Sequence, residues 1–117
     1  YKIAYKDKSL VYATDTEGYV GANKKLVLFA RDTDLLIHDA QYTSEEYLNA
    51  YFSKQGYGHS TFDMALETFS QAKAKSLAFF HFDPNYNDEF LLEIENHYTE
   101  NCKNCFIPKE GQEIVLR

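Results

Sequence analysis

Imidazole and carboxylate side chains recur in this sequence where short apolar runs end. Asp15, the pair His38 and Asp39, and His81 each come at the end of such a run, and His59 comes just before a run with helical periodicity. Imidazole and carboxylate are the ligands that zinc, iron and manganese use in hydrolytic sites, where a metal-bound water becomes a nucleophile near neutral pH. These residue types predict a hydrolytic metal site if the fold brings the positions together.

The elements that would position these side chains alternate between strands and helices. We expect strands, from their apolar runs, at residues 3–5, 10–13, 35–37, 76–80, 106–107 and 113–116. We expect helices, from their apolar spacing and caps, at residues 23–31, 43–55, 60–72 and 87–98. Their predicted inner faces are, in order, Leu26, Val27 and Phe29; Tyr47, Leu48, Tyr51 and Phe52; Phe62, Ala65, Leu66, Phe69 and Ala72; and Leu91, Ile94 and Tyr98. The order β-β-α-β-α-α-β-α-β-β is typical of the layered α/β class. Buried sheets present chemistry at the carboxyl ends of their strands, so the polar residues there are expected to converge.

Each candidate also has a structural reading. Asp15 fits a turn or a helix cap after a strand. His38 and His81 fit buried histidines bonded to backbone carbonyls. His59 fits an ordinary loop residue before a helix capped by Ser60. In the functional alternative, His59 lies beside exposed helix amides, where it would hold an anion or donate a proton.

Length and charge limit the class of protein. The chain has 117 residues, of which 44% are apolar, so we expect one domain over residues 1–117 with a core of its own. The formal charge of -6 argues against long-range attraction to nucleic acid or to anionic membranes. A bound metal pair would reverse the field locally, so a polyanionic substrate stays compatible with this charge.

The sequence shows no membrane-spanning segment. No apolar run approaches the roughly 20 residues that span a bilayer, so we expect a soluble, cytoplasmic protein without membrane contact.

The two ends of the sequence add further expectations. The chain starts at Tyr1, without an initiator Met and directly in strand-like alternation, which suggests a fragment or a processed piece. Cys102 and Cys105 form a late Cys-x-x-Cys, which we expect to be two reduced, structurally neutral thiols, with a labile disulfide or metal binding as alternatives.

Four segments, taken in order, resemble the metallo-β-lactamase-fold hydrolases. Residues 10–17 are similar to their strand with Thr-Asp-Thr, and residues 35–40 to the His-Glu-Ala-Thr segment of the ribonuclease Z branch. Residues 58–61 resemble the His-Ser-Thr segment of that branch, and residues 80–84 its Thr-His-Phe-Ser segment. Asp39 replaces the glutamate of the second segment, and Gln41 its threonine. These two changes weaken an assignment to transfer-RNA processing in particular.

The resemblance implies a fold and a mechanism. The fold would be an αββα sandwich of two similar halves, of which this chain is the second. Asp15 would bridge two divalent metal ions, zinc in the first instance and manganese or iron otherwise, and His81 would ligate one of them. A metal-bridging hydroxide would attack a phosphodiester. His59 would hold the phosphate or protonate the leaving oxygen, and His38 or Asp39 would orient it.

The family's His-x-His-x-Asp-His motif does not occur in this chain. Its ligands would come from an N-terminal half of the same domain, and we expect the chain to be inactive alone. Related branches leave cyclic-nucleotide phosphodiesters, lactones and small esters open as substrates. Two non-hydrolytic alternatives are an assembly module whose exposed sheet face pairs with another copy as a homodimer, and a redox or metal-binding role for Cys102 and Cys105.

Overall fold

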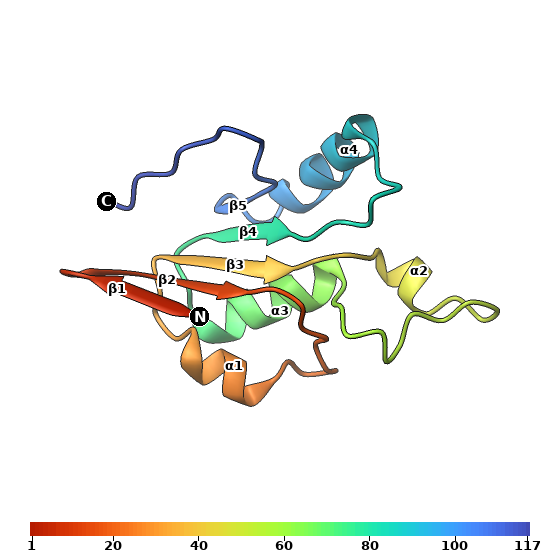
Figure 1. Cartoon of the computed structure of the whole chain (residues 1–117), viewed down its shortest axis with the longest axis horizontal. Coiled ribbons are helices and arrows are strands. Elements are labelled where there is room, and N and C mark those ends of the chain that lie inside the picture. Colours follow the sequence, from red (N-terminus) through yellow and green to blue (C-terminus); the bar gives the residue numbers. More distant parts are fainter.

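The chain folds around one mixed five-stranded sheet, and the computed structural model describes residues 1–117 (Figure 1). Neighbouring strands follow the order of the sequence: β1 Lys2–Tyr5, β2 Lys8–Ala13, β3 Leu35–Asp39, β4 Leu77–Phe80 and β5 Cys105–Phe106. β1 and β2 form an antiparallel hairpin, and the pairs from β2 to β5 are parallel. The carboxyl ends of β2, β3 and β4 therefore lie at the same edge of the sheet.

Four helices connect these strands. Their bounds are α1 Lys24–Phe29, α2 Ser44–Tyr47, α3 Phe62–Ala72 and α4 Asp88–Thr99. Each helix is preceded by a capping residue whose side-chain oxygen accepts a backbone N–H of the first turn. These capping residues are, in order, Asn23, Thr43, Thr61 and Asn87. No helix has the length and apolar character needed to cross a membrane.

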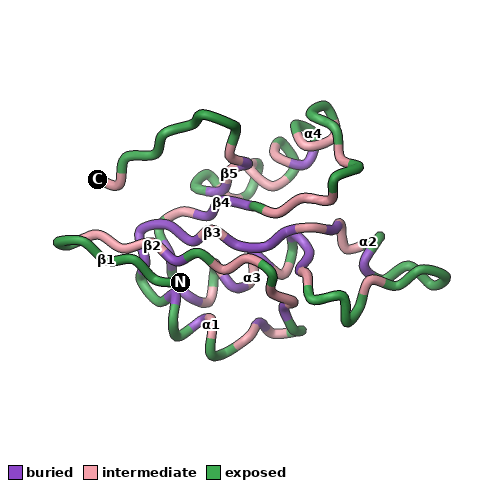
Figure 2. The backbone as a smooth tube through the Cα atoms, viewed as in Figure 1, coloured by how far each residue is buried: buried purple, intermediate pink, exposed green.

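One face of the sheet carries the core. Val11 pairs with Leu36 and Leu36 with Leu77, so these three side chains point to the same side. All three are fully buried in one cluster with Phe62 and Ala65 of α3. The buried stretches along β3 and β4 are visible in Figure 2. Burial of this face anchors the edge at which β3 and β4 end.

Two predicted helix faces are confirmed. In α3, Phe62 and Ala65 are fully buried, and Phe69 packs against the core. In α4, Ile94 is buried and the ring of Tyr98 stacks on that of Phe62, with 5.7 Å between their centroids. The apolar spacing in the sequence therefore identified the sides of α3 and α4 that face the sheet.

The opposite face of the sheet leaves large apolar side chains accessible. Tyr12 alternates with the buried Val11, and Phe80 with the buried Phe79. The rings of Tyr12 and Phe80 meet edge to face at 6.0 Å, yet each residue is 37% exposed. Ile3, on the hairpin strand, is also exposed. An apolar surface of this kind is unusual on an isolated domain and is typical of a surface that another element covers.

The helix expected over residues 43–55 is wrong in its second part, because α2 ends at Tyr47. Asn49 explains the end: its side-chain oxygen accepts the backbone N–H groups of Tyr51 and Phe52. A local side-chain acceptor of this kind competes with helical hydrogen bonding. Leu48, Tyr51 and Phe52 are exposed, so burial offers no compensation.

The final strand expected at residues 113–116 is also absent, and the strand expected at 106–107 is β5, Cys105–Phe106. A strand needs a partner backbone, and β5 is only 2 residues long, so it offers the following segment no ladder to extend. The observed order is therefore β-β-α-β-α-α-β-α-β. The α1 prediction was right in place but not in its inner face, since Val27 is buried and Phe29 is exposed.

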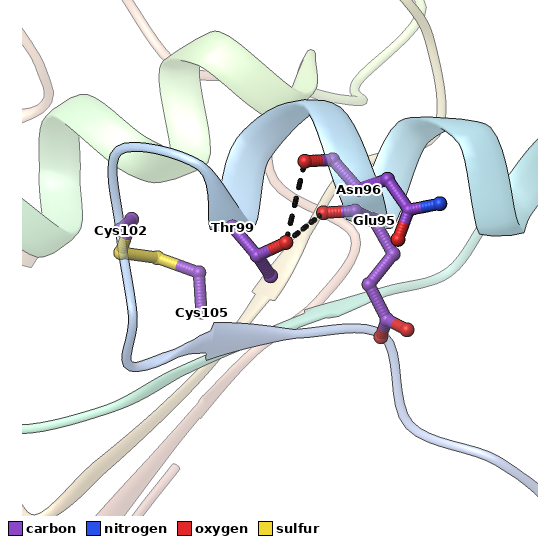
Figure 3. Close-up of a disulfide and its surroundings, with 5 residues drawn as sticks. All are labelled: Glu95, Asn96, Thr99, Cys102 and Cys105. Carbon is purple, nitrogen blue, oxygen red and sulfur yellow. Dashed lines mark hydrogen bonds between the residues drawn. A yellow bond between two sulfur atoms is a disulfide. The ribbon is translucent and has the colours of Figure 1, made fainter.

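Cys102 and Cys105 form a disulfide, so the expectation of two reduced thiols is wrong (Figure 3). The chain turns sharply between α4 and β5, where Cys105 N–H donates to the carbonyl of Cys102, and the two Cα atoms lie 5.5 Å apart. This spacing lies within the range for a disulfide. Glu95 reinforces the same junction, since its carboxylate accepts the backbone N–H of Ile107 at 2.6 Å.

Asp34, just before β3, gives a prediction for acid stability. Its carboxylate accepts hydrogen bonds from Lys75 Nζ at 2.7 Å and from Ser9 N–H at 2.8 Å. The hydrogen bond from Lys75 is the main cause that lowers the pKa of Asp34. A lowered pKa adds stability above the unfolded-state pKa of about 3.9, and this contribution disappears as the pH falls through the folded-state pKa.

Asp34→Asn is therefore expected to lower the free energy of unfolding at pH 7, with a smaller deficit as the pH drops below about 4. Urea unfolding at a series of pH values would measure the change. Asp32→Asn is the control, because Asp32 is exposed and Asn tolerates its left-handed backbone (φ 57°). An Asp34→Asn deficit that stays constant down to pH 2 would contradict the prediction.

Candidate metal centre

Asp15 and His81 lie just beyond the carboxyl ends of two strands. Asp15 follows β2 by two residues, and His81 follows β4 directly. Both have a left-handed backbone, with φ of 51° for Asp15 and 64° for His81. This conformation is costly for residues other than glycine and is found preferentially at functional sites. The two local backbone bends aim the side chains at each other.

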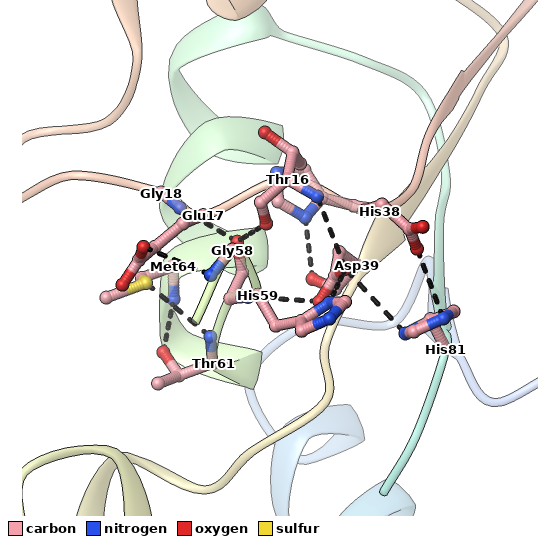
Figure 4. Close-up of polar contacts among 12 residues, drawn as sticks. Thr16, Glu17, Gly18, His38, Asp39, Gly58, His59, Thr61, Met64 and His81 are labelled. Atoms are coloured by element: carbon pink, nitrogen blue, oxygen red, sulfur yellow. Dashed lines mark hydrogen bonds and ion pairs between the residues drawn. The ribbon is translucent and has the colours of Figure 1, made fainter. Parts of the chain in front are cut away.

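The side chains of Asp15, Asp39, His59 and His81 meet at the edge of the sheet. His81 Nε2 lies 3.1 Å from Asp15 Oδ1, and His81 Nδ1 lies 3.8 Å from Asp39 Oδ2. His59 Nδ1 lies 2.8 Å from the same Asp39 oxygen. The rings of His59 and His81 stack with 4.8 Å between their centroids, and Figure 4 shows both beside Asp39. The convergence expected from the strand ends is therefore present.

This group has the composition and spacing of a metal site. One ligand atom from each of the four residues can be chosen so that all lie within 4.8 Å of one another. Imidazole and carboxylate suit zinc, manganese or iron. Asp39 is fully buried, and the buried Nδ1 of His81 has no hydrogen-bond partner in the protein. A buried polar atom without a partner is costly, and a cation at the centre of the group would satisfy it.

His38 does not reach this group. Successive side chains of a strand point to opposite faces, so Asp39 points to the site and His38 points into the core. His38 is fully buried, and its Nδ1 donates to the carbonyl of Asp39 at 2.7 Å. Burial is the main cause that lowers the pKa of His38. Of the two residues expected to orient His59, only Asp39 contacts its ring.

Ser60 joins the site in a way that the sequence did not indicate. It is not the helix cap, because Thr61 caps α3. Instead its hydroxyl donates to the carbonyl of Thr16 at 2.6 Å and accepts the N–H of Gly18 at 2.9 Å. Its backbone N–H donates to Asp39 Oδ1 at 3.0 Å. Ser60 thus connects the segment that follows β2 and the last residue of β3 to the segment that carries His59.

Glu17 is a second residue that sequence reasoning missed. Its carboxylate accepts hydrogen bonds from Gly56 N–H, Tyr47 Oη–H and Gly58 N–H. Burial by itself would raise the pKa of Glu17, but these hydrogen bonds outweigh it and lower the pKa. Burial, together with the bond to Glu17, raises the pKa of Tyr47 to about 12. The only local signal was the position of Glu17, two residues after Asp15.

Curated relatives of the chain share one name. The chain is 34% identical to ribonuclease Z of Pyrococcus furiosus over 108 residues, which are 92% of this chain and 31% of that protein. It is 34% identical to ribonuclease Z of Bacillus subtilis over 99 residues, which are 85% and 30%. For ribonuclease Z of Thermococcus sibiricus the identity is 37% over 110 residues, which are 94% and 32%. No family model matches the chain.

Solved structures agree on the fold. The metallo-β-lactamase fold protein YhfI of Bacillus subtilis superposes with a TM-score of 0.72 at 18% identity, covering 95% of this chain and 41% of that one. The short form of human tRNase Z gives a TM-score of 0.68 at 22% identity, covering 99% and 37%. The chain is thus similar over most of its length to one part of ribonuclease Z, and it shares the metallo-β-lactamase fold. It spans about a third of the length of the curated relatives it matches. The resemblance based on four short segments is confirmed.

Proposed function

We propose that this ribonuclease Z homologue carries one part of the active site of a metal-dependent phosphodiesterase that cleaves RNA. The observation that carries the proposal is the convergence of Asp15, Asp39, His59 and His81 within one small group. The names of the curated relatives supply the class of substrate. The chain's negative charge is compatible with RNA because bound cations would reverse the field at the site.

Asp15 and His81 would hold divalent cations at this group. We infer a pair of ions, zinc in the first instance and manganese or iron otherwise, with further ligands from outside this chain. The cations would supply Lewis-acid stabilisation for charge on the phosphoryl group. Asp15 has a side chain that is 72% exposed, so its carboxylate is free to take further partners.

His59 would supply a proton to the leaving oxygen. Its Nδ1–H donates to Asp39, which fixes the tautomer and leaves Nε2 to carry the transferred proton. The carboxylate of Asp39 would stabilise the imidazolium, as a carboxylate does for the histidine of a catalytic triad. The side chain of His59 is 21% exposed, which leaves it accessible to a substrate.

The accessible face of the sheet would pack against the rest of the same domain. The exposed Ile3, Tyr12 and Phe80 support this proposal, and so does the share of the relatives that the chain spans. We therefore expect this chain to be inactive by itself. Solution mass tests the alternative of an assembly module: a stable homodimer of the full-length protein joined through this face would favour it.

The decisive experiment uses the full-length protein that contains this chain. Metal analysis should find bound divalent ions, and the protein should hydrolyse bis-nitrophenyl phosphate and a short RNA. A full-length protein that retains no metal would overturn the proposal. Hydrolysis of a lactone or a carboxylic ester, without hydrolysis of either phosphodiester, would replace the phosphodiesterase with an ester hydrolase.

A further inference from the structure

We infer that Glu17 is a positioning residue that holds the loop before His59, residues 48–58, and thereby keeps the His59 ring against Asp39. This inference rests on the proposed function, in which His59 transfers a proton. Glu17 belongs to the segment that follows β2, and His59 to the segment that precedes α3. The two segments are about 40 residues apart in the sequence and meet only in the folded chain.

The carboxylate of Glu17 accepts three hydrogen bonds from other parts of the chain. Oε1 accepts Gly56 N–H at 2.6 Å and Tyr47 Oη–H at 2.8 Å, and Oε2 accepts Gly58 N–H at 3.3 Å. Hydrogen bonds to an ionised acceptor are stronger than those between neutral groups. Tyr47 lies at the end of α2, so the carboxylate holds the loop at its beginning and close to its end.

The backbone of the loop is shaped to present these donors. Gly56 and Gly58 have φ of 83° and 87°, a region that glycine adopts without steric cost. A Cβ on either glycine would meet nothing within 4 Å, so the glycines are required by the backbone conformation and not by crowding. Gly58 directly precedes His59 in the chain, so fixing the backbone of Gly58 also restrains the position of the His59 side chain.

Apart from Glu17, the loop is hydrogen-bonded outside itself only to α2, where Lys54 N–H and Ser53 Oγ–H both donate to the carbonyl of Tyr47. Leu48, Tyr51, Phe52 and Tyr57 are exposed, and Figure 1 shows the segment after α2 projecting from the body of the protein. On the other side of His59, Ser60 is fixed by Thr16, Gly18 and Asp39. Loss of Glu17 would therefore leave the fold and the residues after His59 in place, and would free only the residues before it.

The test compares variants of the full-length protein. Glu17→Ala removes all three acceptor contacts, whereas Glu17→Gln keeps one oxygen as an acceptor but turns an amino group toward Gly58 N–H. Tyr47→Phe removes one donor and keeps the ring, and it stands in if Glu17→Ala does not fold. Glu93→Ala is the control, because Glu93 is an exposed carboxylate on α4.

Glu17→Ala should raise the hydrogen-exchange rates of the Gly56 and Gly58 amides roughly 10-fold and speed tryptic cleavage after Lys54. It should lower kcat roughly 10- to 100-fold with KM and bound metal unchanged. For Glu17→Gln, the exchange rates and kcat should lie between those of Glu17→Ala and those of the unaltered protein. For Glu93→Ala, both should equal those of the unaltered protein. Faster exchange with unchanged kcat, or unchanged exchange, would overturn the inference.

If the unaltered protein cleaves no phosphodiester, the proposed function fails, and the inference about Glu17 is then judged separately. In that case the NMR signals of the His59 ring report its position. They should shift in Glu17→Ala and move back toward their original positions in Glu17→Gln. Unchanged ring signals in Glu17→Ala would overturn the positioning role.

Discussion

Asp15→Ala in the full-length protein is expected to abolish stoichiometric metal binding and to lower phosphodiesterase activity by roughly 10³-fold or more. Asp15 is the most exposed carboxylate of the group and pairs with His81 Nε2 at 3.1 Å. Without this carboxylate, His81 would lose its nearest acidic neighbour. Metal content per protein molecule and the rate with bis-nitrophenyl phosphate measure the two effects.

Two further variants make this result specific. Asp15→Asn removes the charge but tolerates the left-handed backbone, so it separates the loss of a ligand from backbone strain. It should lose metal as Asp15→Ala does. Asp7→Ala removes an exposed aspartate whose only ion pair is with the neighbouring Lys8, and it should keep both metal and activity. Full activity in Asp15→Ala would remove the basis for the proposed hydrolase.

His59→Ala is expected to lower kcat by roughly 10²- to 10⁴-fold while the protein keeps its metal. Asp15 and His81 would remain to hold the cations, and only the group that carries the proton would be lost. Steady-state kinetics and metal analysis on the same samples measure this outcome. His97→Ala is the matched control, because His97 lies exposed on α4.

A double variant tests whether Asp39 acts through His59. The hydrogen bond between His59 Nδ1 and Asp39 makes the two residues one unit. Asp39→Asn should therefore lower kcat by much of the factor expected for His59→Ala. The double variant should then lose little more than His59→Ala alone, because residues that act as a unit are not additive. If His59→Ala releases the metal together with the activity, His59 is a ligand and not the proton donor.

Most of the strands and helices were predictable because their residues follow local sequence patterns. The apolar runs predicted β2, β3 and β4, and the polar residues after them marked the edge at which the site lies. The spacing of Phe62, Ala65 and Phe69 identified the buried face of α3. Strands and helices of this kind leave a period of 2 or 3.6 in the sequence, and burial of one face reinforces it.

Other local patterns were overridden. The apolar spacing of Tyr47, Leu48 and Tyr51 suggested a longer helix, but Asn49 ends it and no surface covers its apolar side. The Cys-x-x-Cys did not reveal its state, because the disulfide depends on the turn that brings Cys105 back beside Cys102. Apolar residues at helical spacing do not show whether the folded protein has a surface against which such a helix could pack.

The sequence by itself determined which residues could do chemistry and where they stand: Asp15, the pair His38 and Asp39, and His81 at strand ends, and His59 before a helix. Only the tertiary structure decided that Asp39 and not His38 turns to the site, since alternation separates the two but does not say which face is buried. The same holds for the roles of Ser60 and Glu17. Their hydrogen bonds join segments about 40 residues apart, and contacts at that separation leave no periodic trace in the chain that makes them.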